Sequence, residues 1–350
     1  MHLIPVFTGG LMDEKEKKNY LAMWNGSRGA DRNPVNYQRR DDGNHIYKSD
    51  QYFEWWYLDC SFDNGYHAVA TFHYMNGFMN PIVPTSQVMI YKPDGTKVVR
   101  FASFKEDEIY AGADYCDVRM GNDWIKDTGD GYEVSIKIKG VGLHLTFKNI
   151  VPGWKPGTGF LYKNEEKGQL SGWCVPVPYG EVSGELFLKE ETLKVRGAGY
   201  HDHNWGNCSM HGFIEGWYWG RIHNRDYTID YGWVIPRDNE APIMSPLLLA
   251  KGGEIVLSTD MMKAEFADIV RDETNGKDYA KTLTISTDVK EVKLLLKINT
   301  TREIESMELP KVTDWKQYYY RFLADYDMKI EIDGQKDQVG GEMLHELMLL

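Results

Sequence analysis

The feature that most constrains the fold is an alternation of apolar and polar residues with a period of two, repeated in short runs. Residues 132–138 show it clearly, since Val134, Ile136 and Ile138 alternate with Glu133, Ser135 and Lys137. Successive side chains of a β-strand point to opposite faces, so this pattern predicts a strand with one buried face. Turn signals such as Asn64-Gly65 and Asp94-Gly95 separate the runs. The sequence therefore predicts strands joined by tight turns.

The expected strands fall into two sets, one in residues 51–208 and one in residues 209–350. Each set is long enough to bury a core of its own. Short strands in a hairpin rhythm favour meandering antiparallel sheets closed into barrels. We therefore predict an all-β protein of two tandem antiparallel β-barrels packed against each other. Residues 1–50 are expected to form an irregular lead-in with a short helix over residues 13–23, and residues 151–180 a long loop.

The charge and the cysteines restrict the partners and the setting. A net charge of −12 argues against nucleic acid and anionic membranes as partners. We find no apolar run of about 18 residues, and no signal peptide in the first ten residues. The four cysteines show no CxxC spacing: Cys60, Cys116, Cys174 and Cys208. We expect a reduced, cytoplasmic setting and no transmembrane segment, and the oligomeric state stays open.

Aromatic residues are abundant, with 11 Trp and 22 Tyr, and several gather in Glu54-Trp55-Trp56-Tyr57. On a strand, Glu54 and Trp56 share one face, and Trp55 and Tyr57 share the other. A carboxylate among large aromatics in a barrel wall requires a partner or a function. Glu54 is therefore either in a structural salt bridge or part of a binding site.

The segment His201-Asp202-His203-Asn204-Trp205-Gly206 is the second concentration of polar groups. If it is a strand, His201 and His203 share one face, and Asp202 takes the other. Three interpretations stay open. The histidines are metal ligands completed by His211 or His223, although we expect no metal. Alternatively, the segment is a structural corner between domains, in which the buried polar groups are hydrogen-bonded to one another. We favour the third, an acid–base site facing an apolar cavity.

A third aromatic group, Trp217-Tyr218-Trp219, precedes a strand that contains Tyr227, Asp230 and Tyr231. Asp230 lies between Ile229 and Tyr231, so apolar surroundings would keep its carboxylic acid protonated. The equally open alternative is an outward, solvated Asp230 on an amphipathic strand.

Together, Glu54-Trp55-Trp56-Tyr57, the segment 199–206 and Trp217-Tyr218-Trp219 resemble the hydroxyneurosporene synthase (carotenoid 1,2-hydratase) and AttH-like superfamily. The resemblance covers roughly residues 50–350. It implies two tandem lipocalin-like barrels and no metal or organic cofactor. Members include carotenoid hydratases, hydratases of prenylated isoflavonoids and Diels–Alder cyclases, and related lipid carriers do no chemistry. A His-x-Trp pair and a Tyr/Asp pair are associated with catalysis in the hydratases; His203-Asn204-Trp205 matches the first, and Tyr227 with Asp230 is nearest to the second.

We therefore expect a cofactor-independent hydratase that adds water to a carbon–carbon double bond of an apolar, isoprenoid-type small molecule. Asp202 or Asp230 is the expected acid, and His203 or His201, with Tyr227, is expected to hold the water. Substrate-binding residues are expected to line a pocket near the domain interface, and the four tryptophans among them to stabilise the cation: Glu54, Trp56, Trp205, Trp217, Trp219 and Tyr231. The alternatives are a cyclase or isomerase, in which the cavity orients its substrate, and a non-catalytic carrier of hydrophobic ligands.

Overall fold

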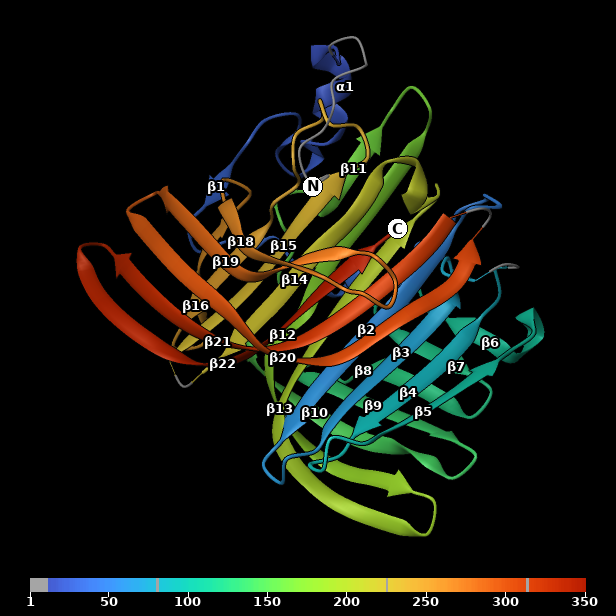
Figure 1. Cartoon of the computed structure of the whole chain (residues 1–350). Coiled ribbons are helices and arrows are strands. Elements are labelled where there is room, and N and C mark those ends of the chain that lie inside the picture. Colours follow the sequence, from blue (N-terminus) through green and yellow to red (C-terminus); the bar gives the residue numbers. More distant parts are fainter. Residues whose placement is uncertain (1–11, 80–81, 225, 313–314) are drawn as a thin grey trace.

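The computed structural model describes residues 12–79, 82–224, 226–312 and 315–350. The first eleven residues of the expected lead-in, and Arg225 in the expected turn at residues 224–226, lie outside the described residues. Strands dominate the fold, which confirms the all-β prediction (Figure 1). The helical elements are short: α1 (Glu14–Asn19), η1 (Ala22–Trp24), η2 (Arg39–Asp42), η3 (Glu106–Glu108) and η4 (Met210–Gly212). Within the described part of the chain, no helix is long and apolar enough to cross a membrane.

The N-terminal sheet holds twelve antiparallel strands of the described chain. They are β2 (Phe53–Phe62), β3 (His67–Met75), β4 (Thr85–Tyr91), β5 (Lys97–Ser103), β6 (Ile109–Ala111), β7 (Asp117–Met120), β8 (Asp123–Asp127), β9 (Gly131–Ile138), β10 (Val141–Val151), β11 (Phe160–Asn164), β12 (Gln169–Leu188) and β13 (Glu191–Gly206). Their order is β5-β4-β3-β2-β13-β12-β10-β9-β8-β7-β6, with β11 paired to β12. The sheet curls around an apolar core that includes Trp56, Leu58, Phe72 and Phe147.

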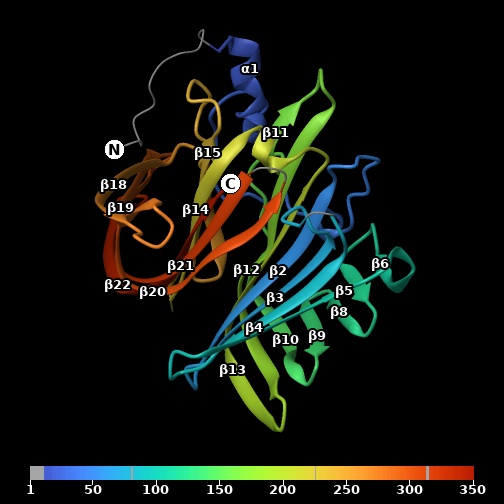
Figure 2. The same cartoon turned by 45° about the vertical axis from the view of Figure 1, so that its right-hand side comes forward.

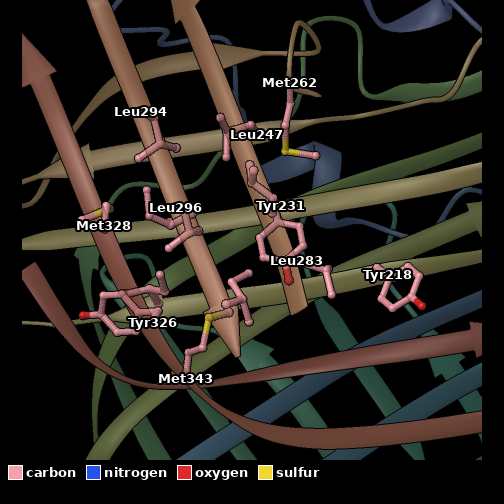
Figure 3. Close-up of a cluster of buried hydrophobic side chains, with 14 of the residues drawn as sticks. Tyr218, Tyr231, Leu247, Met262, Leu283, Leu294, Leu296, Tyr326, Met328 and Met343 are labelled. Carbon is pink, nitrogen blue, oxygen red and sulfur yellow. The ribbon is translucent and has the colours of Figure 1, made fainter. Parts of the chain in front are cut away.

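The C-terminal sheet curls around a second core and lies beside the first sheet (Figure 2). Its strands are β14 (Ile214–His223), β15 (Tyr227–Pro236), β16 (Leu247–Lys251), β17 (Glu254–Thr259), β18 (Lys263–Arg271), β19 (Asp278–Val289), β20 (Val292–Val312), β21 (Trp315–Ile332) and β22 (Gln335–Leu349). Their order is β17-β16-β15-β14-β22-β21-β20-β19-β18. The lead-in strand β1 (Ala30–Asp31) extends this sheet at β17. The second core contains Tyr218, Tyr231, Leu283 and Leu296 (Figure 3).

The prediction of a long loop over residues 151–180 is wrong, because β11 and the first half of β12 lie there. The register between β12 and β13 shifts between Cys174 and Val177, and again between Val177 and Gly180. Pro176 and Pro178 fall in these irregular stretches. A proline lacks the backbone N–H of a sheet ladder and is tolerated at such bulges. The prolines that suggested a loop are therefore accommodated inside a long strand.

The two sheets meet through the faces that point away from their own cores. One shared apolar cluster joins Trp173, Val175 and Tyr200 of the N-terminal sheet to Trp219 and Leu248 of the C-terminal sheet. A second cluster joins the two sheets to Tyr20 and Met23 of the lead-in. Burial of these side chains is the main force expected to hold the sheets together.

Candidate active site

A cavity of about 400 Å³ lies between the two sheets. Its size is within the range of small-molecule sites. On the N-terminal sheet, two rows of neighbouring side chains line it: His73, Trp55, Asn204 and Trp173, and then Gln87, Thr71, Tyr57 and Asp202. Facing these on the C-terminal sheet are Val234, Trp217, Met348 and Tyr319, and then Gly232, Trp219 and Glu346. Aromatic side chains thus dominate both walls.

One lining residue of the cavity lies at the protein surface. Phe101 of β5 lines the cavity and is 66% exposed, whereas the lining residues of β2 and β13 are buried or half-buried.

The strand β13 directs Asp202 and Asn204 into the cavity, and the two share a face as the alternation predicted. The Asp202 carboxylate accepts hydrogen bonds from the Tyr200 hydroxyl and the Asn204 amide, both at 2.9 Å. Burial raises the pKa of Asp202 to about 7, although the hydrogen bond from Tyr200 acts in the opposite direction. A carboxylic acid that is partly protonated at neutral pH can deliver a proton to a bound substrate.

Asp230 is a second buried carboxyl group, on the face of β15 that also carries Gly232. Neither of its oxygens forms a hydrogen bond of good geometry among the described residues, although the nearby side chains of Tyr200 and Trp219 act to lower its pKa. Burial, and then the nearby charge of Asp202, raise the pKa of Asp230 well above its usual range. Asp230 does not line the cavity itself, but it lies near both Tyr200 and Asp202.

An ion pair lines the opposite side of the cavity, where sequence reasoning expected nothing. The buried Arg321 donates from Nε to Glu346 Oε1 at 3.0 Å. The Tyr57 hydroxyl lies 3.3 Å from the same carboxylate and accepts from Arg321 at 2.5 Å. Arg321 thus compensates the charge of the Glu346 carboxylate, which faces the cavity.

His201 and His203 point away from the cavity, into the curled N-terminal sheet. His203 Nε2 lies 2.9 Å from Glu54 Oε1, and its Nδ1 lies 3.4 Å from Asp42 Oδ1. The other oxygen of Asp42 lies 3.1 Å from His201 Nε2. Burial alone would lower the pKa of His203, but the hydrogen bonds to Asp42 and Glu54 outweigh it and raise the pKa to about 9. Because Asp42 belongs to η2, this cluster fastens the lead-in inside the sheet.

Three groups in this interior bring potential metal-ligand atoms within 4.8 Å of one another. They are Asp42 with Cys174 and His203, Asp42 with Cys116 and His201, and His45 with Glu54 and His203. Among the described residues, neither His211 nor His223 joins such a group. Ion pairs and hydrogen bonds among the imidazoles and carboxylates explain their proximity, so we assign no metal there.

Several residues expected to face a ligand lie elsewhere, because the alternation turns their side chains to the opposite face. Glu54, Trp56 and Trp205 lie on the His203 side of the N-terminal sheet, where Trp56 stacks on His203 with 4.3 Å between ring centroids. Tyr227 and Tyr231 lie in the core of the C-terminal sheet, as Figure 3 shows for Tyr231. This corrects the expected location of these residues, whereas Trp217 and Trp219 do line the cavity.

Known proteins share parts of this sequence. A family model described as Diels-Alderase-like matches residues 154–302. A protein of Chlorobaculum tepidum named hydroxyneurosporene dehydrogenase is 39% identical over 83 residues, which are 22% of this chain and 22% of that protein. The matched segments span between about a fifth and a third of the length of the curated relatives.

Solved structures share the fold over most of the chain. An AttH-like protein from Nitrosomonas europaea superposes with a TM-score of 0.63 at 18% identity, covering 88% of this chain and 95% of that one. Kievitone hydratase from Nectria haematococca superposes with a TM-score of 0.58 at 15% identity, covering 85% and 88%. These likenesses confirm the expected lipocalin-like fold, which the chain shares with the AttH-like structure.

Proposed function

We propose that this chain is a cofactor-independent enzyme in which Asp202 acts as general acid on an apolar small molecule bound between the sheets. The reaction that we favour is the addition of water to a carbon–carbon double bond of an isoprenoid-type compound. One observation carries the proposal: a buried carboxyl group whose pKa is about 7 faces a cavity lined by aromatic rings. An acid that must protonate carbon at neutral pH requires this combination.

The proposed reaction begins when the Asp202 carboxylic acid transfers its proton to one alkene carbon, which leaves a cation on the other. Trp217 and Trp219 present π faces that stabilise a desolvated cation by about 1–2 kcal/mol each. The oxygen of a water molecule then bonds to the cationic carbon. We assign the holding of this water, and acceptance of its proton, to Glu346 with Tyr57. Glu346 then releases this proton to solvent and Asp202 takes one up, which completes the cycle with no net change in the enzyme.

His201 and His203 take a positioning role in this proposal, because their nitrogens are engaged with Asp42, Glu54 and the backbone of β2. We assign Asp230 no step in the reaction, because its side chain does not line the cavity. Tyr227 has no part, because its hydroxyl bonds to Asp337 at 3.0 Å.

The names of the related proteins support this class of chemistry. Kievitone hydratase adds support for hydration, although its likeness to this chain concerns the fold. The Diels-Alderase-like match supports the second candidate, a cyclase in which the cavity shapes a flexible polyene and orientation supplies the rate. A carrier that returns its ligand unchanged is the third.

The test is incubation of the purified full chain with a panel of acyclic polyenes and prenylated phenols, followed by chromatography and mass spectrometry. A mass gain of one water supports hydration. A new retention time at unchanged mass supports the cyclase. Recovery of the bound ligand in unaltered form contradicts both the hydratase and the cyclase.

Two substitutions separate the enzymatic candidates. Gly232 lines the cavity, and a Cβ there would lie 3.4 Å from the Pro246 ring, an ordinary contact, so G232A narrows the cavity without a backbone clash. A cyclase loses more rate in G232A than in D202N, whereas a hydratase shows the reverse. G212A is the matched control, because a Cβ at Gly212 meets no atom within 4 Å.

A further inference from the structure

His73 is a buried imidazole in the cavity wall that the proposed chemistry does not use. It lies on β3 and is 6% exposed. Its ring packs against Trp55 and Phe78, with centroid separations of 5.9 and 6.1 Å. Its Nδ1 has no hydrogen-bond partner among the described residues. Nδ1 is enclosed by protein, but the ring also lines the cavity, so a ligand there would meet the accessible edge of a buried imidazole that lacks a full set of partners.

The polar neighbours of His73 do not satisfy it. Asn76 donates its side-chain amide to Thr85 Oγ1 at 2.8 Å, so these two groups bond to each other. Burial lowers the pKa of His73 to about 3, and no charged side chain acts against this. The imidazole is therefore neutral at physiological pH and offers one donor and one acceptor.

We propose that His73 is a specificity-determining residue that forms a hydrogen bond with a hydroxyl group of the substrate. A hydroxyl group can donate and accept, so it matches the imidazole in either tautomer. The substrate class is then an apolar chain that carries a hydroxyl group at one end, such as a prenylated phenol, and not a pure hydrocarbon.

The sheet sets the distance between this anchor and the acid. His73 pairs with Trp55, which pairs with Asn204, and Asp202 lies two residues before Asn204 on the same strand. Two strand spacings and one two-residue step separate the Cα atoms of His73 and Asp202 by roughly 12 Å. The hydroxyl group of the substrate and its reacting double bond should be separated by a similar distance. This inference rests on the proposed function of Asp202.

The experiment measures binding by calorimetry with two compounds that differ in one oxygen, para-geranylphenol and geranylbenzene. The wild-type chain is expected to bind the phenol roughly tenfold more tightly, as one hydrogen bond supplies. In H73F the two compounds should bind with about equal affinity. The affinity for geranylbenzene should stay at its wild-type value, which shows that the cavity is intact. H73Q retains part of the preference, because its amide can also donate and accept.

The control is H67F, six residues earlier on β3 and outside the cavity lining, in which the tenfold preference stays. The proposal is overturned if the wild-type chain binds the two compounds with equal affinity or binds neither of them. It is also overturned if H73F still binds the phenol tenfold more tightly than geranylbenzene. Turnover is scored separately. If the wild-type chain binds the phenol more tightly but forms no product, the enzymatic function is contradicted. The role of His73 in binding the hydroxyl group is then still supported.

Discussion

Asp202 and His203 are adjacent on β13 but face opposite sides of the N-terminal sheet, and their protonation behaviour differs accordingly. Asp202 faces the cavity between the sheets, where burial raises its pKa to about 7. His203 faces the interior, where Asp42 and Glu54 raise its pKa to about 9. The motif therefore joins a proton donor on one face to an ionic anchor on the other. This separation yields independent predictions for activity and for stability.

Replacement of Asp202 by Asn should lower kcat by about 10²–10⁴-fold, because the amide cannot donate a proton to carbon. Substrate affinity should change little, since Asn204 can still hydrogen-bond to the new side chain. Steady-state kinetics with a substrate identified from the panel checks this. D288N, at an exposed position on β19, serves as the control and should match the wild-type rate. A kcat within threefold of wild type in D202N would show that Asp202 is not the acid.

The rate should fall as pH rises through about 7, because the acid must be protonated in order to react. Above that value each pH unit should lower kcat/KM about tenfold. The measurement is a pH profile of kcat/KM for the wild-type chain and for D202N. The residual activity of D202N should lack this descending limb. A wild-type rate that increases between pH values of about 6 and 8 would argue for a general base in place of the acid.

Replacement of Asp42 by Asn should lower the free energy of unfolding by about 3–5 kcal/mol, because it removes one charge from a buried ionic cluster. The protonated His203 would then keep only Glu54 as its ionised partner. Urea unfolding followed by tryptophan fluorescence measures the loss. The neighbouring variant D41N provides the comparison. Asp41 pairs with Lys155 at 2.9 Å in a partly exposed site, so its loss should cost about 1 kcal/mol or less.

The same cluster predicts how stability depends on pH. The folded-state pKa of His203 lies above its ordinary value of 6.5, so the native state binds this proton more tightly than the unfolded chain does. The contribution is therefore complete below pH 6.5 and is lost as pH rises through about 9. Urea unfolding across this range should show a decline for the wild-type chain. If H203Q shows an equal decline, His203 is not its source.

The strand pattern predicted much of the fold. The alternation over residues 132–138 located β9 at its observed position, since the period of two depends only on local backbone geometry. It also predicted correctly that Asp202 and His203 face opposite ways. It failed across residues 151–180, where proline signals hid a strand whose bulges accept them. Short strands such as β6 and β7 were missed because three or four residues carry too little periodic signal.

The sequence by itself determined which side chains share a face of a strand, but it did not determine what each face meets. Glu54 and Trp56 were expected in the ligand pocket, yet Tyr57 lines it, because packing of the two sheets decides which face becomes the cavity wall. Tyr57 meets Glu346 across a separation of 289 residues, and His201 meets Asp42 across 159. Such contacts leave no local signal, because they form only when strand order and sheet packing bring distant segments together. Tertiary structure therefore decided which of the polar residues became the site.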